Sequence, residues 1–139
     1  TILLIGALNA RFGWPPVIPF WLQLLAGAIM TLGYLLFSWA MSANRFFSAV
    51  VRVQKDRGHS VVSTEPYRYV RHPAYAGSVF LVLATPLLLG SAWALIPGVL
   101  TAAAIVARAV LEDATLQRDL DGYAAYARQV RFRLIPGVW

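Results

Sequence analysis

The densest group of chemically active side chains in the sequence is the segment HSVVSTEPYRYVRHPAYAG, residues 59–77. Within it, Pro73 disfavours a helical conformation at His72 and suits the first position of a helix that follows. The amide groups that open such a helix, next to Arg71 and His72, would form a binding site for an anion. Tyr75 would add an aromatic face for a flat ring or a cation. The segment therefore predicts a ligand-binding site.

Each of these features also has a simpler interpretation. A His-Pro pair before a membrane helix is commonly a capping arrangement, and arginines at helix ends often extend to lipid headgroups. Tyrosines at a membrane interface commonly form an aromatic belt. The number of different functional groups in one short segment favours a binding site over these separate roles.

A second group consists of Arg108, Glu112 and Asp113. Arg108 and Glu112 are four residues apart on one helical face, where an ion pair would contribute roughly 0.2–0.5 kcal/mol. They also lie where an apolar helix leaves the bilayer, a position at which ionisable groups are costly and often functional. The sequence leaves both interpretations open.

The residue counts exclude several kinds of site. The chain of 139 residues has no cysteine, which rules out disulfides, thiolate metal sites and a cysteine nucleophile. Its two histidines are too few for a zinc site without carboxylate ligands, and we predict no metal site. The net charge of +6 suits either nucleic acid or anionic lipid. Because no basic stripe alternates with exposed aromatic residues, we predict contact with membrane lipid and no nucleic-acid partner.

The apolar pattern predicts that membrane helices position these groups. With 59% hydrophobic and 13% charged residues, the chain is too apolar for a soluble domain of its size. Residues 20–41 are an uncharged segment long enough to cross a bilayer. Residues 74–89 and 92–107 are shorter, and Gly90 with Ser91 between them predicts the turn of a helical hairpin. We therefore expect an all-α fold, an integral membrane helical bundle.

The charged residues indicate the topology. They lie mostly in two segments, 44–72 and 108–139, which two membrane crossings separate. Both segments are rich in arginine, so the positive-inside rule places them on the cytoplasmic face, and the compact length favours a prokaryotic inner membrane. Residues 107–129 have helical composition throughout, and we expect them to continue the last spanning helix as an amphipathic C-terminal helix.

These elements are expected to form one membrane domain over residues 1–139. Its N-terminal spanning helices, the first of them truncated, cover residues 1–43, and a cytoplasmic cofactor-binding arm covers residues 44–77. The helical hairpin covers residues 74–107, and a cytoplasmic C-terminal segment covers residues 108–139.

Together, the two groups of residues resemble the motifs of the isoprenylcysteine carboxyl methyltransferase family of membrane methyltransferases. Its first motif reads roughly His-x-Leu/Val-Val-Thr-x-Gly-x-Tyr, followed by Arg-His-Pro-x-Tyr-x-Gly. The matching residues of this chain are His59, Val61, Val62, Tyr67, Arg71, His72, Pro73, Tyr75 and Gly77. The second motif is an acidic pair followed by a leucine and two tyrosines, matched by Glu112, Asp113, Leu116, Tyr123 and Tyr126. Glu65 stands where the family usually has glycine, and Asp113 where it usually has glutamate.

The resemblance implies S-adenosylmethionine as cofactor and a lipophilic or lipid-modified substrate. The implied cofactor-binding residues are His59, Val62, Tyr67, Arg71, His72, Pro73 and Tyr75. The implied substrate-binding residues are Arg108, Glu112 and Asp113, of which Arg108 and Glu112 would be catalytic. A carboxylate acceptor, which we favour, needs no base and would be held by Arg108. An amine acceptor would need a base, for which Glu112 is the candidate.

Two other functions stay open at this point. Membrane sterol and steroid reductases carry a similar Arg-His-Pro-x-Tyr-x-Gly stretch and use NADPH, but the element His59-x-Val61-Val62 and the acidic pair favour the methyltransferases. The other alternative is a non-enzymatic membrane protein whose arm binds lipid. The concentration of tyrosine, arginine and histidine in the arm argues against it.

Overall fold

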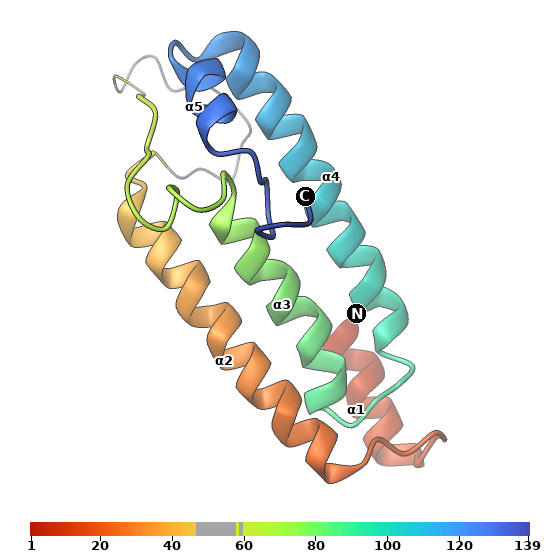
Figure 1. Ribbon diagram of the computed structural model, residues 1–139. Coiled ribbons are helices and arrows are strands. Elements are labelled where there is room, and N and C mark those ends of the chain that lie inside the picture. Colours follow the sequence, from red (N-terminus) through yellow and green to blue (C-terminus); the bar gives the residue numbers. More distant parts are fainter. Residues whose placement is uncertain (47–57, 59) are drawn as a thin grey trace. The chain divides into compact units, whose positions relative to one another are not determined.

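The computed structural model describes residues 1–46, 58 and 60–139, and these described residues form five α-helices (Figure 1). The helices are α1 (Ile2–Phe12), α2 (Phe20–Ala43), α3 (Pro73–Leu88), α4 (Leu95–Asp119) and α5 (Tyr123–Gln129). The contacts divide the chain into two compact units. Unit 1 consists of Thr1–Leu35 and Gly77–Ile105, and unit 2 of Leu36–Ala76 and Val106–Trp139. The boundary between the units passes through α2, α3 and α4.

In unit 1, glycines of α2 allow close packing against α3. A Cβ atom built on Gly27 would lie 3.5 Å from Leu88, at one end of α3. A Cβ atom built on Gly33 would lie 3.0 Å from the carbonyl oxygen of Gly77, at the other end of α3. The two helices therefore run antiparallel, with the backbones closest at Gly33.

The predicted helical hairpin is confirmed, because α3 and α4 follow one another around a turn at Gly90 (Figure 1). Gly90 has a φ of 68°, which glycine adopts without steric cost. The second helix begins at Leu95, later than the expected residue 92. The reason is local: the Ser91 hydroxyl oxygen accepts a hydrogen bond from the Ala94 amide at 3.2 Å, so the residues between them form the capping turn.

The first helix, α1, extends to Phe12 and stops where Gly13 takes a φ of 62°. Its buried Asn9 is held by two hydrogen bonds within unit 1. The Ser91 hydroxyl donates to Asn9 Oδ1 at 3.1 Å, and Asn9 Nδ2 donates to the Trp14 carbonyl at 3.3 Å. These bonds join the chain after α1 to the α3–α4 turn.

Two helices, α2 and α4, are long and apolar enough to cross a membrane by length and composition. Only 11% of the apolar window of α2 and 17% of that of α4 is buried. A core helix of a soluble protein would bury most of such a window, whereas a lipid-facing helix leaves its apolar side chains outside. The helices α1 and α3 are shorter apolar helices.

In unit 2, α4 continues to Asp119, as expected for a spanning helix that extends beyond residue 107. The prediction of one unbroken helix to residue 129 is wrong. The chain turns between Asp119 and Tyr123, where Gly122 has a φ of 82°, and the short helix α5 follows. Leu120 is buried at this turn, so burial of an apolar side chain accompanies the break in the helix.

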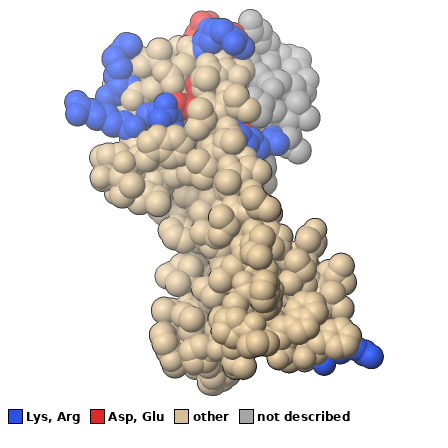
Figure 2. Space-filling view, turned by 90° about the vertical axis from the view of Figure 1, so that its right-hand side faces the viewer, with Lys and Arg blue, Asp and Glu red and all other residues tan. Residues whose placement is uncertain are grey.

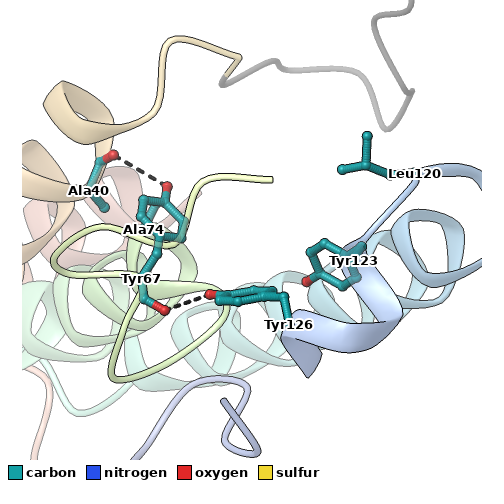
Figure 3. Packing of buried hydrophobic residues seen from close by; sticks show 6 residues of the cluster. All are labelled: Ala40, Tyr67, Ala74, Leu120, Tyr123 and Tyr126. Atoms are coloured by element: carbon teal, nitrogen blue, oxygen red, sulfur yellow. Dashed lines mark hydrogen bonds between the residues drawn. The ribbon is translucent and has the colours of Figure 1, made fainter. Parts of the chain in front are cut away.

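The core of unit 2 is built largely from tyrosines (Figure 3). The Tyr67 hydroxyl donates to the Ala40 carbonyl at the end of α2, and the Tyr126 hydroxyl donates to the Tyr67 carbonyl at 2.6 Å. The Tyr126 ring meets the Tyr123 ring edge to face at 5.4 Å. Through these contacts the core joins α2, the segment before α3, and α5. Its buried members are Ala40, Tyr67, Ala74, Leu120, Tyr123 and Tyr126.

Candidate active site

Asp113 of α4 is the centre of a buried hydrogen-bond network in unit 2, and its side chain is 1% exposed. Arg71 binds it with two parallel hydrogen bonds, from Nε to Oδ1 (2.8 Å) and from Nη2 to Oδ2 (2.9 Å). This two-pronged geometry is the strong form of an arginine–carboxylate pair. His72 Nε2 lies 3.2 Å from Oδ1, and the Tyr123 hydroxyl donates to the same oxygen at 3.0 Å.

Two more donors complete this network. Gln117 Nε2 donates to Asp113 Oδ2 at 2.8 Å, and Arg133 Nε donates to the same oxygen at 3.0 Å. Both carboxylate oxygens are then surrounded by more partners than the roughly four lone-pair positions of a carboxylate can serve. Asp113 is therefore saturated by protein groups. We call this set the Asp113 network: Arg71, His72, Asp113, Gln117, Tyr123 and Arg133.

The network also fixes the chain that follows α5. Arg71 Nη1 donates to the carbonyl oxygens of Val130 (2.8 Å) and Arg131 (2.9 Å), and the Arg71 amide donates to the Phe132 carbonyl (2.9 Å). One buried arginine thus connects the start of α3, the C-terminal half of α4 and the C-terminal segment. These three regions are remote in sequence, so the residue organises the tertiary structure of unit 2.

Burial and the charge of Asp113 shift the pKa of two members of the network, Arg71 and Tyr123. Burial lowers the pKa of Arg71, but the hydrogen bonds and charge of Asp113 outweigh this effect and hold that pKa above its ordinary value. Burial and the neighbouring carboxylate of Asp113 raise the pKa of Tyr123. Arg71 therefore stays charged, and Tyr123 stays a neutral hydrogen-bond donor.

A second group lies at the first turn of α3. The Tyr75 hydroxyl donates to Glu112 Oε2 at 2.6 Å and accepts a hydrogen bond from Arg108 Nε at 2.7 Å. The Tyr75 ring also lies 5.8 Å from the ring of His72. Arg108 and Glu112, for which the sequence left an ion pair and a functional site open, are thus bridged by a phenol. All three side chains of this bridge are partly exposed.

The other expected cofactor-binding residues have different environments. Pro73 is fully buried as the first residue of α3, which confirms its predicted position in the helix. Tyr67 is buried with its hydroxyl bonded to Ala40, and Val62 packs against the tyrosine-rich core. His59 lies outside the described residues.

Two residues have partners that the sequence did not predict. We expected Arg71 to contact the cofactor and Asp113 to contact the acceptor, yet in the structure they bind each other and both are buried. A ligand would reach either group only by displacing these hydrogen bonds. In this conformation their observed role is to hold the start of α3 against α4, and their contacts with ligands stay predictions.

Sequence reasoning missed Gln117 and Arg133. Gln117 had a signal, because it lies four residues after Asp113 on the same helix, where a glutamine and an aspartate can meet. Arg133 had none, since it is one of several arginines in its segment and reaches Asp113 only through the fold of unit 2.

The charged residues are unevenly distributed between the units. Of the 12 basic and 6 acidic residues, only Arg11 falls in the sequence ranges of unit 1. Figure 2 shows broad areas of uncharged surface and a gathering of basic and acidic groups on a limited part of the face in view. Unit 2 is thus the part of the chain with the groups needed for chemistry on polar or charged molecules.

Comparison with known proteins gives consistent results. The family model of the isoprenylcysteine carboxyl methyltransferase (ICMT) family matches residues 24–118. The protein-S-isoprenylcysteine O-methyltransferase of Schizosaccharomyces pombe is 39% identical over 70 residues, which cover 50% of this chain and 30% of that protein. The structure of the eukaryotic intramembrane Ras methyltransferase ICMT, solved without a monobody, superposes with a TM-score of 0.77 at 23% identity. That match covers 99% of this chain and 50% of the other, and it shows the fold.

The chain therefore spans half or less of the length of these two relatives. The family match and the exposed apolar windows of α2 and α4 together support an integral membrane protein, whose described residues form an all-helical fold. The family model matches more than half of the chain, including the first turn of α3 and the acidic pair of α4. The chain belongs to the isoprenylcysteine carboxyl methyltransferase family.

Proposed function

We propose that this protein transfers a methyl group from S-adenosylmethionine to the carboxylate of a lipophilic acceptor of the prenylcysteine type. One observation carries the proposal: in unit 2 the two family motifs are hydrogen-bonded to each other at two places. The first motif supplies Arg71 and Tyr75, and the second supplies Glu112 and Asp113. Family membership and the name of the yeast relative support the reaction class.

The described residues fit a donor of this kind. S-adenosylmethionine supplies, when bound, a methyl group on a positively charged sulfur. Glu112 provides a partly exposed carboxylate that would face such a cation. Val61 and Val62 are partly buried apolar side chains that would contact a purine ring, and Tyr67 supports them from the core.

The acceptor would be held mainly by Arg108. A guanidinium binds a carboxylate through charge-assisted hydrogen bonds and would direct one oxygen toward the methyl group. No proton has to leave a carboxylate, so Glu112 is not needed as a base for this acceptor. The reaction forms a C–O bond to the methyl carbon and breaks its bond to sulfur, turning a carboxylate and a sulfonium into an ester and a thioether. Because both charges disappear, exclusion of water by the packed core would favour the step.

The proposal is tested with the full chain purified in detergent and S-adenosylmethionine labelled in the methyl group. We expect label to enter an S-farnesylcysteine derivative with a free carboxylate, and to be released by alkali as expected of an ester. The same molecule with its carboxylate converted to an amide is the matched control and should stay unlabelled. Labelling of a farnesyl amine instead would move the assignment to amine chemistry. Binding of NADPH without binding of S-adenosylmethionine would overturn the methyltransferase assignment.

We also propose that unit 2 faces the cytoplasm of a prokaryotic cell, since its sequence ranges contain nearly all arginines. The chain has no native cysteine, so single cysteines report topology directly. Ser63→Cys and Gln129→Cys, both at exposed positions, should be labelled from the cytoplasmic side of oriented vesicles. Val17→Cys, at an 84% exposed position, should be labelled only from the opposite side. Labelling of Ser63→Cys and Gln129→Cys from opposite sides would contradict the proposed topology.

A further inference from the structure

We infer that Tyr75 acts as the positioning residue for the acceptor site, through a hydroxyl that holds Arg108 and Glu112 in one orientation. This inference rests on the proposed function. It differs from the expectation that Tyr75 contacts the cofactor, and it is carried by the two hydrogen bonds of the hydroxyl, at 2.7 Å to Arg108 and 2.6 Å to Glu112.

The hydrogen bonds have a fixed direction. Arginine has only donors, and an ionised carboxylate has only acceptors. The Tyr75 hydroxyl therefore accepts from Arg108 Nε and donates its own hydrogen to Glu112 Oε2. A phenylalanine ring at this position would lose both bonds at once, while keeping the ring volume.

Tyr75 can serve this purpose because its ring is itself held in place. It belongs to the first turn of α3, and it packs with Ala76, Ala109 and Leu134 in a second buried cluster of unit 2. On another side it lies 5.8 Å from the ring of His72, a member of the Asp113 network. The position of the hydroxyl is thus set by buried neighbours rather than by the partly exposed groups that it binds.

An unrestrained arginine would be a poor acceptor site. Its long side chain would lose rotamer entropy on binding, and a carboxylate is bound well only when the plane of the guanidinium is correctly directed. A bond from Nε to Tyr75 fixes that plane before the acceptor arrives. The inference therefore predicts an effect on acceptor binding and not on cofactor binding.

The test uses Tyr75→Phe in the full chain, with Tyr34→Phe as the matched control. Tyr34 lies on α2 in unit 1, is 61% exposed and belongs to neither family motif. Tyr75→Phe should raise the KM for the carboxylate acceptor roughly tenfold, since bonds to a charged group are lost. The dissociation constant for S-adenosylmethionine should change less than about twofold, which also shows that the variant is folded. Tyr34→Phe should match the wild type in both quantities.

A second substitution tests the coupling directly. Arg108→Lys keeps the positive charge but removes the Nε–H donor and the planar fork. Adding Tyr75→Phe to this variant should raise the acceptor KM by less than about twofold, because lysine has no guanidinium plane that Tyr75 could orient. Independent, multiplicative effects of the two substitutions would overturn the inference. A loss of cofactor affinity in Tyr75→Phe with an unchanged acceptor KM would also overturn it and place Tyr75 at the donor.

Wild-type activity separates the two proposals. If the wild type transfers methyl groups and Tyr75→Phe behaves like Tyr34→Phe, only the positioning role fails. If the wild type transfers no methyl group to the carboxylate acceptor, the proposed function fails and the inference falls with it.

Discussion

The two units of this chain satisfy their buried polar groups in different ways. Unit 1 has one charged side chain, Arg11, and satisfies buried polar groups with neutral hydrogen bonds such as that between Ser91 and Asn9. Unit 2 buries an aspartate with arginines around it, and Arg71 is 7% exposed. A buried ion pair is costly to assemble and rarely adds stability over a well-packed apolar core. Its presence in unit 2 supports the proposal that this unit carries the chemistry, whereas unit 1 consists mainly of packed apolar helices.

The same contrast appears in how the helices approach one another. In unit 1 the absence of a side chain brings backbones together, as at Gly33 and Gly77. In unit 2 long side chains connect segments that are far apart in sequence, as Arg71 does with Asp113 and Val130. Packing of the first kind is sensitive to added volume, and packing of the second kind is sensitive to lost charge.

The largest effect is expected for Asp113→Asn, which removes the only acidic charge of the Asp113 network. Arg71 and Arg133 would lose their carboxylate partner, and breaking a buried pair in this way costs about 3–5 kcal/mol. Thermal unfolding in detergent should show a large loss of stability, together with loss of methyl transfer. Asp121→Asn, the same change at an exposed site, should leave both unaffected. Equal unfolding temperatures for the two variants would show that the buried charge is not essential to unit 2.

A smaller effect is expected for Gly33→Ala in unit 1. The added Cβ atom would lie 2.9 Å from Phe80 Cβ and 3.0 Å from the Gly77 carbonyl oxygen, so α2 and α3 would have to separate. Overpacking of this kind costs roughly 1–3 kcal/mol. Gly27→Ala is the control on the same helix, because its Cβ atom would meet only Leu88 at an ordinary 3.5 Å. It should be neutral or slightly stabilising, since alanine favours helix over glycine. If Gly33→Ala unfolds no earlier than Gly27→Ala, the close approach is not needed.

The smallest effect is expected for Tyr123→Phe, which removes one of several donors to Asp113 at a cost of about 1 kcal/mol. The difference should depend on pH. The pKa of Tyr123 is raised in the folded protein, so its contribution is fully present below the unfolded pKa of about 10 and declines as pH rises above that value. Wild type should therefore lose stability between pH 9 and 11 more steeply than Tyr123→Phe, measured as unfolding temperature. Parallel pH profiles would contradict this assignment.

The helices were the most predictable part of the molecule. The length of the uncharged segments predicted α2 and the hairpin, and Pro73 predicted where α3 begins. These signals are local, so they can be read from neighbouring residues alone. The break before α5 was not predicted, since Gly122 lies within otherwise helical composition and burial of Leu120 depends on tertiary packing.

The sequence predicted which residues belong to the site, but it did not predict which of them bind each other. The two motifs identified Arg71, Tyr75, Glu112 and Asp113, and Arg108 was identified by its position four residues before Glu112. All five residues lie in unit 2. Which carboxylate meets which partner could not be read from spacing, because the helix geometry of α4 and the entry of the chain into α3 decide it together. The structure assigns Asp113 to Arg71 and Glu112 to Tyr75.

The acidic pair has a consequence for how this site can vary. Glu112 and Asp113 are consecutive on α4 and so point about 100° apart around the helix axis. One added residue after Leu111 would rotate Glu112 into the direction of Arg71 and leave the newcomer facing Tyr75. A substitution at one of these two positions therefore alters one contact. An insertion or deletion in this stretch of α4 would rotate both side chains away from their present partners. We expect related proteins to differ here by exchange of residues and to keep the length of this helix between Arg108 and Asp113 constant.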